Sequence, residues 1–195
     1  DAPQMDYNPD VAWTRPPTLE RPLPFYFERQ RDAQCGLQAL NNAVGEAWQT
    51  VEDMKRAADV YLEESSREGS AEARSRHIAP GGWYSSEVMA KAVETTPMHK
   101  NNRVEYVVKL QPLHVNPDRI YSSSVVGAFV NVENWHWVAL RYVESKLYLL
   151  DSLRGRPIAM SEREYRVYVK KHPHSYCIER AQDMSLSASS APTEH

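Results

Sequence analysis

The stretch "WHWVALRYVESKLYLLDSL", residues 135–153, indicates the fold class of this chain. Residues 135–143 and 146–153 are rich in β-branched and aromatic side chains, and their residue pattern has the period of two that is typical of strands. Only Glu144 and Ser145 separate the two segments. The stretch therefore predicts a β-hairpin whose turn lies at these two residues.

The length of that turn decides how His136 and Asp151 are placed. A turn with an even number of residues pairs position 138 with position 151. His136 and Asp151 are then diagonal neighbours on one face, roughly 7–8 Å apart at the backbone. An odd-length loop without a bulge would place them on opposite faces. Since "VESK" is a weak turn signal, the residues alone leave both arrangements open.

Segments with the same period flank the hairpin, and helical patterns precede it. Further strands are predicted over residues 104–110, 124–132 and 175–181. Apolar residues that recur every three to four positions predict helices over 35–44, over 51–62 and after Ser85 or Ser86, and a short helix is predicted after Ser161. Helices first and a meander of strands afterwards are typical of an α+β fold, in which a helical layer packs on an antiparallel sheet.

Capping signals predict where these helices begin. Thr50 with Asp53, and Ser161 with Glu164, have the spacing of a capping box. Asp32 is expected to cap the first helix from its N-terminal side.

The chain divides into three parts by composition. Residues 1–24 contain six of the 13 prolines, which excludes a helix and predicts an extended arm. Residues 25–181 form the expected domain, and the small polar residues 182–195 form an expected disordered tail. Within the domain, residues 63–80 lack an apolar stripe and predict a mobile arm or loop that only tertiary contacts would make helical. Because the chain begins with Asp1 rather than Met, we expect it to be trimmed or cut from a longer protein.

Composition also limits the partners and the compartment. A net charge of -3 gives no long-range attraction for nucleic acid or anionic lipid. No segment approaches the roughly 20 apolar residues of a membrane span. The two cysteines, Cys35 and Cys177, suggest no disulfide framework and favour a reducing compartment. We expect a cytoplasmic or nuclear monomer with no nucleic-acid or membrane partner.

Cys35 is the residue around which a catalytic site can be built. It stands at the N-terminus of a predicted helix, where unpaired backbone N–H groups favour a thiolate. His136 can act as its base if Asp151 accepts a hydrogen bond from one ring nitrogen and the other nitrogen faces the thiol. Gln30, five residues before Cys35, can join the Cys35 backbone N–H in stabilising an oxyanion, an effect worth about 3–4 kcal/mol.

Each of these residues also has an ordinary structural interpretation. A lone cysteine in a helix more often fills space in the core. A lone histidine in a strand is more often structural, and an aspartate at a strand end more often serves a turn. Trp135 and Trp137 flank His136, and core packing is expected for at least one of them. Considered together, the four candidate residues support the catalytic interpretation about as well as the structural one.

Three segments resemble the Josephin family of papain-like cysteine proteases, which act as deubiquitinases. They are "ERQRDAQCGLQALNN" (28–42), "GGWYSSEVMAKAV" (81–93) and "HWVALRYVESKLYLLDSL" (136–153). The resemblance extends over roughly residues 25–180 and implies a papain-like fold. It also implies hydrolysis of the isopeptide or peptide bond after the C-terminal glycine of ubiquitin.

The resemblance assigns a role to each candidate residue. Cys35 is the nucleophile, His136 the base, Asp151 the residue that orients the base, and Gln30 the oxyanion donor. The implied partner is ubiquitin or a ubiquitin conjugate, and the reaction needs neither a metal nor another cofactor.

The sequence departs from the family pattern at a few positions. Gly36 stands where the family tends to have alanine, and Gln38 stands where it usually has histidine. Residues 63–80 fall where the family has a helical arm over the substrate cleft, and they are unusually polar here. His172 and His174 lack enough further ligands nearby for a zinc site.

Other functions fit part of the pattern. A protease acting on another polypeptide or on a ubiquitin-like modifier would keep the same chemistry. A catalytically silent module would bind ubiquitin without cleaving it, although the intact set of four residues argues against silence. An acyltransferase or transglutaminase also uses Cys, His and Asp in this order, but the flanks of all three residues are Josephin-like.

Overall fold

The computed structural model describes residues 26–30, 32, 34–65, 71–79, 82–96 and 106–181. Its helices are α1 (Cys35–Val44), α2 (Val51–Glu64), α3 (Ala71–His77), α4 (Ser86–Thr95), α5 (Glu162–Lys171) and the 3₁₀ helix η1 (Pro117–Tyr121). Its strands are β1 (Ile78–Ala79), β2 (Trp83–Tyr84), β3 (Tyr106–Lys109), β4 (Val125–Val132), β5 (His136–Val143), β6 (Lys146–Leu150), β7 (Ile158–Met160) and β8 (Ser175–Arg180). The predictions for residues 1–24 and 182–195 lie outside the described residues. Among the described helices, none is both long and apolar enough to cross a membrane.

The main sheet confirms the α+β fold but corrects the order of its strands. It has six antiparallel strands in the order β3-β8-β4-β5-β6-β7. A meander therefore holds only from β4 to β7. The last strand of the chain, β8, returns to lie between β3 and β4, and this pairing of distant segments leaves no local sequence signal.

The β5–β6 hairpin has the even turn that places His136 and Asp151 on one face. Val143 pairs with Lys146, and Ala139 pairs with Leu150. Continuing this register by one residue puts position 151 opposite position 138. The turn residues Glu144 and Ser145 have φ angles of 49° and 63°. Such left-handed turns usually contain Asn and Gly, which explains why "VESK" is a weak signal.

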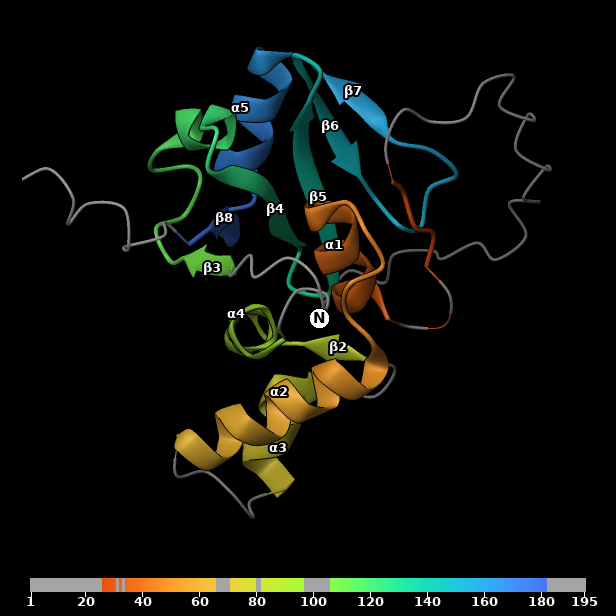
Figure 1. Cartoon of the computed structure of the whole chain (residues 1–195), viewed down its shortest axis with the longest axis vertical. Helices are drawn as coiled ribbons and strands as arrows, with labels where there is room; N and C mark the ends of the chain where they lie inside the picture. Colours follow the sequence, from red (N-terminus) through yellow and green to blue (C-terminus); the bar gives the residue numbers. More distant parts are fainter. Residues whose placement is uncertain are drawn as a thin grey trace, which may run out of the picture.

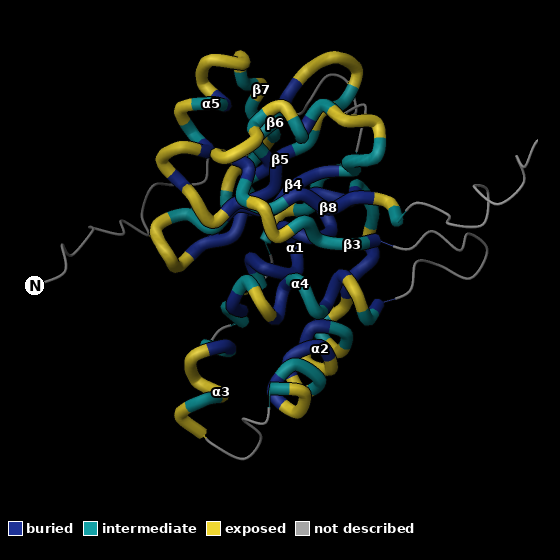
Figure 2. Tube along the Cα trace, turned by 90° about the vertical axis from the view of Figure 1, so that its left-hand side faces the viewer, coloured by how far each residue is buried: buried dark blue, intermediate teal, exposed yellow. Residues whose placement is uncertain are grey.

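An apolar core lies on each face of the six-stranded sheet, whose strands are drawn in Figure 1. Because side chains alternate along a strand, Phe129 and Trp137 lie in one core, while Val130 and Val138 lie in the other. Residues of α1, α2 and α4 complete the first core, and residues of α5 and η1 complete the second. The fully buried residues run through α1 and the central strands β4, β5 and β8 (Figure 2).

Helix α1 lies unusually close to the sheet. A Cβ atom on Gly127 of β4 would come 2.1 Å from the Ala43 carbonyl oxygen of α1. Only glycine allows this approach, and the close contact fixes the distance of α1 from β4 and β5. The helix ends at Gly45, whose φ of 89° forms a left-handed C-cap.

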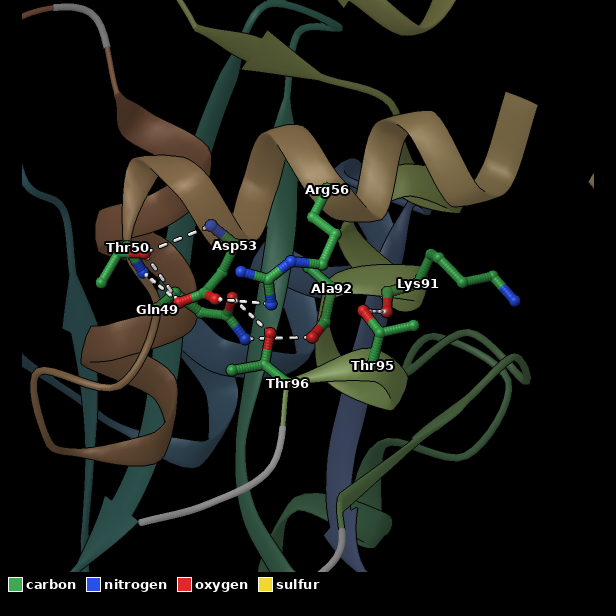
Figure 3. Close-up of polar contacts among 8 residues, drawn as sticks. All are labelled: Gln49, Thr50, Asp53, Arg56, Lys91, Ala92, Thr95 and Thr96. Carbon is green, nitrogen blue, oxygen red and sulfur yellow. Dashed lines mark hydrogen bonds and ion pairs between the residues drawn. The ribbon is translucent and has the colours of Figure 1, made fainter. Parts of the chain in front are cut away.

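Polar contacts hold the remaining helices of this layer together. Thr50 and Asp53 form the predicted capping box at the start of α2. The Gln49 side chain donates a hydrogen bond to the Ala92 carbonyl (3.1 Å) and accepts one from the Thr96 hydroxyl (3.2 Å) (Figure 3). The start of α2 is thereby joined to the end of α4.

The other predicted caps have mixed outcomes. Ser85 caps α4, and Ser161 with Glu164 forms the capping box of α5. The prediction for Asp32 is wrong, because the N-cap of α1 is Gln34, which makes no side-chain capping bond.

Part of the segment predicted to be a mobile arm or loop is ordered. Residues 71–77 form α3, where tertiary contacts supply what the sequence pattern lacks. Arg74 pairs with Asp59 of α2 at 2.9 Å. The buried His77 ring packs edge-on against Tyr61 of α2, with centroids 4.8 Å apart, and bonds the Ser85 hydroxyl. Figure 1 shows α2 and α3 at the end of the molecule opposite α5.

Candidate active site

The site begins with a hydrogen bond between two strand ends. His136 opens β5, and Asp151 directly follows β6. His136 Nε2 lies 2.8 Å from Asp151 Oδ1. The hairpin register thus brings two residues 15 positions apart into direct contact.

Asp151 is held by further partners. Its Oδ1 atom also accepts a hydrogen bond from the Leu153 backbone N–H at 3.0 Å, and its Oδ2 atom lies 3.3 Å from Arg154 Nε. The chain turns sharply after β6 to make these contacts, with Arg154 N donating to the Asp151 carbonyl. Contacts other than the one to the histidine ring therefore also hold the carboxylate in position.

Helix α1 brings the thiol to the same place. Cys35 is the first residue of α1 and is 6% exposed. Its thiol lies close enough to His136 to help raise the pKa of that ring. Because Nε2 of His136 is engaged by Asp151, the ring's other nitrogen, Nδ1, is left for the thiol. Cys35, His136 and Asp151 therefore lie together, and the bond between His136 and Asp151 is the hydrogen bond among them.

The charge state of His136 follows from these contacts. Burial disfavours the charged ring, but the hydrogen bond to Asp151 and the nearby Cys35 side chain outweigh burial and raise the pKa of His136 to about 9. Burial also opposes ionisation of Asp151, yet the contacts with His136, Leu153 and Arg154 hold the pKa of this carboxyl below its ordinary value. The histidine is thus protonated and the aspartate ionised at neutral pH.

Gln30 joins the site through the residue after Asp151. The Gln30 backbone N–H donates to the Ser152 carbonyl at 2.8 Å, and the Ser152 hydroxyl donates to Gln30 Oε1 at 3.3 Å. The described hydrogen bonds of Gln30 therefore go to Ser152 rather than to Cys35. They place Gln30 beside the end of β6 and leave its side-chain NH₂ group as a donor.

The residues that hold the Gln30 segment did not emerge from the sequence pattern. Asn42 donates to the Glu28 carbonyl at 2.9 Å and accepts from the Glu28 backbone N–H at 2.6 Å. Asn41 donates to the Glu28 carboxylate at 3.1 Å and accepts from Gln49 N at 2.7 Å. The available signal was the adjacent pair of asparagines inside a mostly apolar helix, where both are buried.

The two tryptophans beside His136 differ in their surroundings. Trp137 is completely buried, and its indole N–H donates to the Tyr84 carbonyl at 2.7 Å. Trp135 is 52% exposed, and its ring stacks on His136 with centroids 5.2 Å apart. Core packing therefore explains Trp137 but not Trp135, which covers one side of the histidine.

The two unusual positions of α1 lie in close packing. A Cβ atom on Gly36 would come 2.9 Å from Met89 Sδ and 3.4 Å from the Tyr84 ring. Gln38 is 3% exposed, and its side-chain oxygen has no hydrogen-bond partner among the described residues. Both residues form part of the packing beneath Cys35.

The second cysteine differs from the first. Cys177 lies in β8 with no exposed surface, and burial raises the pKa of its thiol to about 12. Within the described ranges, no group of three or more His, Cys, Asp or Glu residues is placed to hold a metal ion.

Comparisons with known proteins match most of the chain. The sequence model of the Josephin family matches residues 30–176. A protein named Ataxin-3 homolog, from Caenorhabditis briggsae, is 25% identical to this chain over 161 residues, which are 79% of this chain and 46% of that protein. The chain thus spans about half the length of this relative. The range matched by the family model includes the four candidate residues.

Proposed function

The chain belongs to the Josephin family, and we propose that it is a thiol-dependent deubiquitinase. In this proposal it hydrolyses the isopeptide or peptide bond that follows the C-terminal glycine of ubiquitin. Cys35 is the nucleophile, His136 the general acid and base, Asp151 the residue that orients His136, and Gln30 an oxyanion donor. Members of this family are typically cysteine deubiquitinases.

One observation carries the proposal: the hydrogen bond between His136 and Asp151 at 2.8 Å, with the Cys35 thiol beside the same imidazole ring. Its members come from a helix start, a strand start and a strand end. A buried cysteine that only fills space needs no imidazole on its sulfur. A protonated histidine beside a thiol favours the thiolate, which is the reactive form.

The proposed reaction uses each group in turn. The Cys35 thiolate attacks the carbonyl carbon of the C-terminal glycine, and the negative charge moves to the carbonyl oxygen. The Gln30 amide and the Cys35 backbone N–H donate to that oxygen. His136 gives its proton to the leaving lysine amine, and an acyl-enzyme remains. His136 then takes a proton from water, and the resulting hydroxide releases ubiquitin and the free thiol.

The experiment that tests this proposal is labelling by ubiquitin with a thiol-reactive electrophile at its C-terminus. The protein should form a covalent adduct that Cys35→Ala abolishes. Cys177→Ala is the matched control and should label like the parent, since that thiol is buried and its pKa is raised to about 12.

His136→Ala should label more slowly, because it removes the charged partner of the thiol. The expected loss at pH 6.5 is roughly 100-fold or more, since a side chain in this acid–base role contributes about 10²–10⁴-fold. If the ubiquitin probe failed to label the parent while iodoacetamide still modified Cys35 rapidly at this pH, a reactive Cys35 thiolate would remain supported. Ubiquitin would then be the wrong substrate, and another polypeptide would take its place.

A further inference from the structure

We propose that Ser152 is a positioning residue that fixes the orientation of the Gln30 side chain for oxyanion binding. This inference rests on the proposed function. It adds that the dipeptide Asp151-Ser152 serves two parts of the site at once: Asp151 holds the base, and the next residue holds the oxyanion donor.

The Gln30 segment needs such support because it has no regular secondary structure. Residues 26–30 form neither helix nor strand. Two hydrogen bonds between Asn42 and the backbone of Glu28, at 2.6 and 2.9 Å, fix one end of this segment to α1. The Glu28 carboxylate adds bonds to Tyr26 (2.6 Å) and Asn41 (3.1 Å). These contacts hold the backbone two residues before Gln30 but not the Gln30 side chain.

Ser152 supplies the missing contact. Its carbonyl accepts the Gln30 backbone N–H at 2.8 Å, and its hydroxyl donates to Gln30 Oε1 at 3.3 Å. Ser152 is 3% exposed, so little water competes for this bond. The backbone bond sets where Gln30 lies, and the hydroxyl bond sets which way its amide faces.

The chemistry of the amide explains why its orientation matters. A glutamine side chain has an acceptor oxygen and a donor NH₂ group that exchange places when the amide turns over. With Oε1 bound to the Ser152 hydroxyl, the NH₂ group remains available to the developing oxyanion. In the reverse orientation the oxygen would face that negative charge and repel it. A donor held in place before the reaction also needs no reorganisation during it.

Steady-state hydrolysis of a ubiquitin C-terminal amide tests the inference. Ser152→Ala keeps the backbone bond and removes only the hydroxyl. A bond of this kind is worth about 0.5–1.5 kcal/mol, so kcat should fall roughly two- to tenfold while KM stays unchanged. Ser152→Thr retains a hydroxyl and should keep most of the parent's kcat. Ser175→Ala removes another buried serine hydroxyl, one in β8 outside the site, and should leave kcat unchanged.

Two further readouts separate positioning of Gln30 from a structural effect. In a Gln30→Ala background the Ser152→Ala substitution should have no further effect on kcat, because the group that Ser152 positions is already gone. The rate at which iodoacetamide modifies Cys35 should be the same in the parent and in Ser152→Ala, since alkylation forms no oxyanion.

Three results would overturn the inference alone, in a protein that does hydrolyse ubiquitin amides. The first is an unchanged kcat in Ser152→Ala. The second is an equal loss in the Gln30→Ala background, and the third is a parallel loss of alkylation rate, which would mean that Ser152 acts on the thiol and histidine instead. A parent that hydrolyses no ubiquitin amide would overturn the proposed function, and this inference with it.

Discussion

The His136 ring is buried, yet its environment favours the charged form. Burial alone would lower the pKa of His136, whereas the hydrogen bond to Asp151 and the nearby Cys35 side chain raise it to about 9. The carboxylate contributes both a hydrogen bond and its charge. The proton that the leaving amine requires in the proposed reaction is therefore present across the neutral range.

This charge state predicts how activity depends on pH. Because the raised pKa keeps His136 protonated until the pH approaches 9, kcat/KM for a ubiquitin amide should fall as the pH rises through about 9. Asp151→Asn keeps a hydrogen-bond acceptor but removes the charge, so the alkaline fall should move to lower pH. Asp118→Asn, which changes an exposed carboxylate in η1, is the control and should leave the profile in place. Coincident profiles for the parent and Asp151→Asn would contradict this account of the histidine.

At the scale of single residues, the sequence predicted the candidate catalytic residues but not the residues that hold them in place. Cys35, His136 and Asp151 stand at the ends of predicted elements, and the structure joins His136 to Asp151 by a hydrogen bond with the Cys35 thiol beside the ring. Ser152 could not be recognised in the same way, and Asn42 offered only the weaker signal of an asparagine pair within a helix. A serine or asparagine that orients a neighbour looks the same in a sequence as one that faces water, until its partner is known.

At the scale of elements, the approach of α1 to β4 is the contact on which the site depends most. An added Cβ on Gly127 would overlap the Ala43 carbonyl at 2.1 Å. That neighbour is backbone, and it cannot move unless the whole helix moves. The thiol at the start of α1 would then leave the histidine at the start of β5.

Gly127→Ala should therefore destabilise the protein and reduce its activity. Overpacking against backbone is expected to lower the free energy of unfolding by about 3 kcal/mol or more, measured by denaturant unfolding. Gly36→Ala is the contrasting variant. Its nearest neighbour is the flexible end of Met89 at 2.9 Å, and alanine favours a helix over glycine, so the loss should be smaller. Equal losses in the two variants would show that the approach of α1 is not what Gly127 provides.

Local patterns predicted helices and their starts better than strand order. The capping boxes at Thr50 and Ser161 are local signals, and the predicted starts of α2 and α5 are confirmed. The insertion of β8 between β3 and β4 depends on contacts between distant segments, and so does the helicity of α3. Asp32 failed as a cap because its φ of 55° places it in a turn before Gln34.

At the scale of the whole molecule, the sheet serves as the frame on which the site is assembled. The face covered by α1, α2 and α4 carries the thiol of Cys35 at the start of α1. The strand ends carry the histidine and the aspartate. The α+β class was predictable because the change of period from 3.6 to 2 is a property of long segments. The sequence did not predict that α5 and η1 cover the other face of the sheet. Which face a helix covers depends on the path of the chain between distant elements.

The central claim is that ubiquitin passes through a thioester on Cys35, and rapid acid quenching followed by mass spectrometry tests it most directly. The protein is mixed with a ubiquitin amide, stopped during the first turnover, and digested to locate the bound ubiquitin. We predict a hydroxylamine-sensitive ubiquitin adduct on the peptide that contains Cys35, unchanged in Cys177→Ala and lost together with hydrolysis in Cys35→Ala. Hydrolysis that continues in Cys35→Ala, or an adduct on any other residue, would contradict the account.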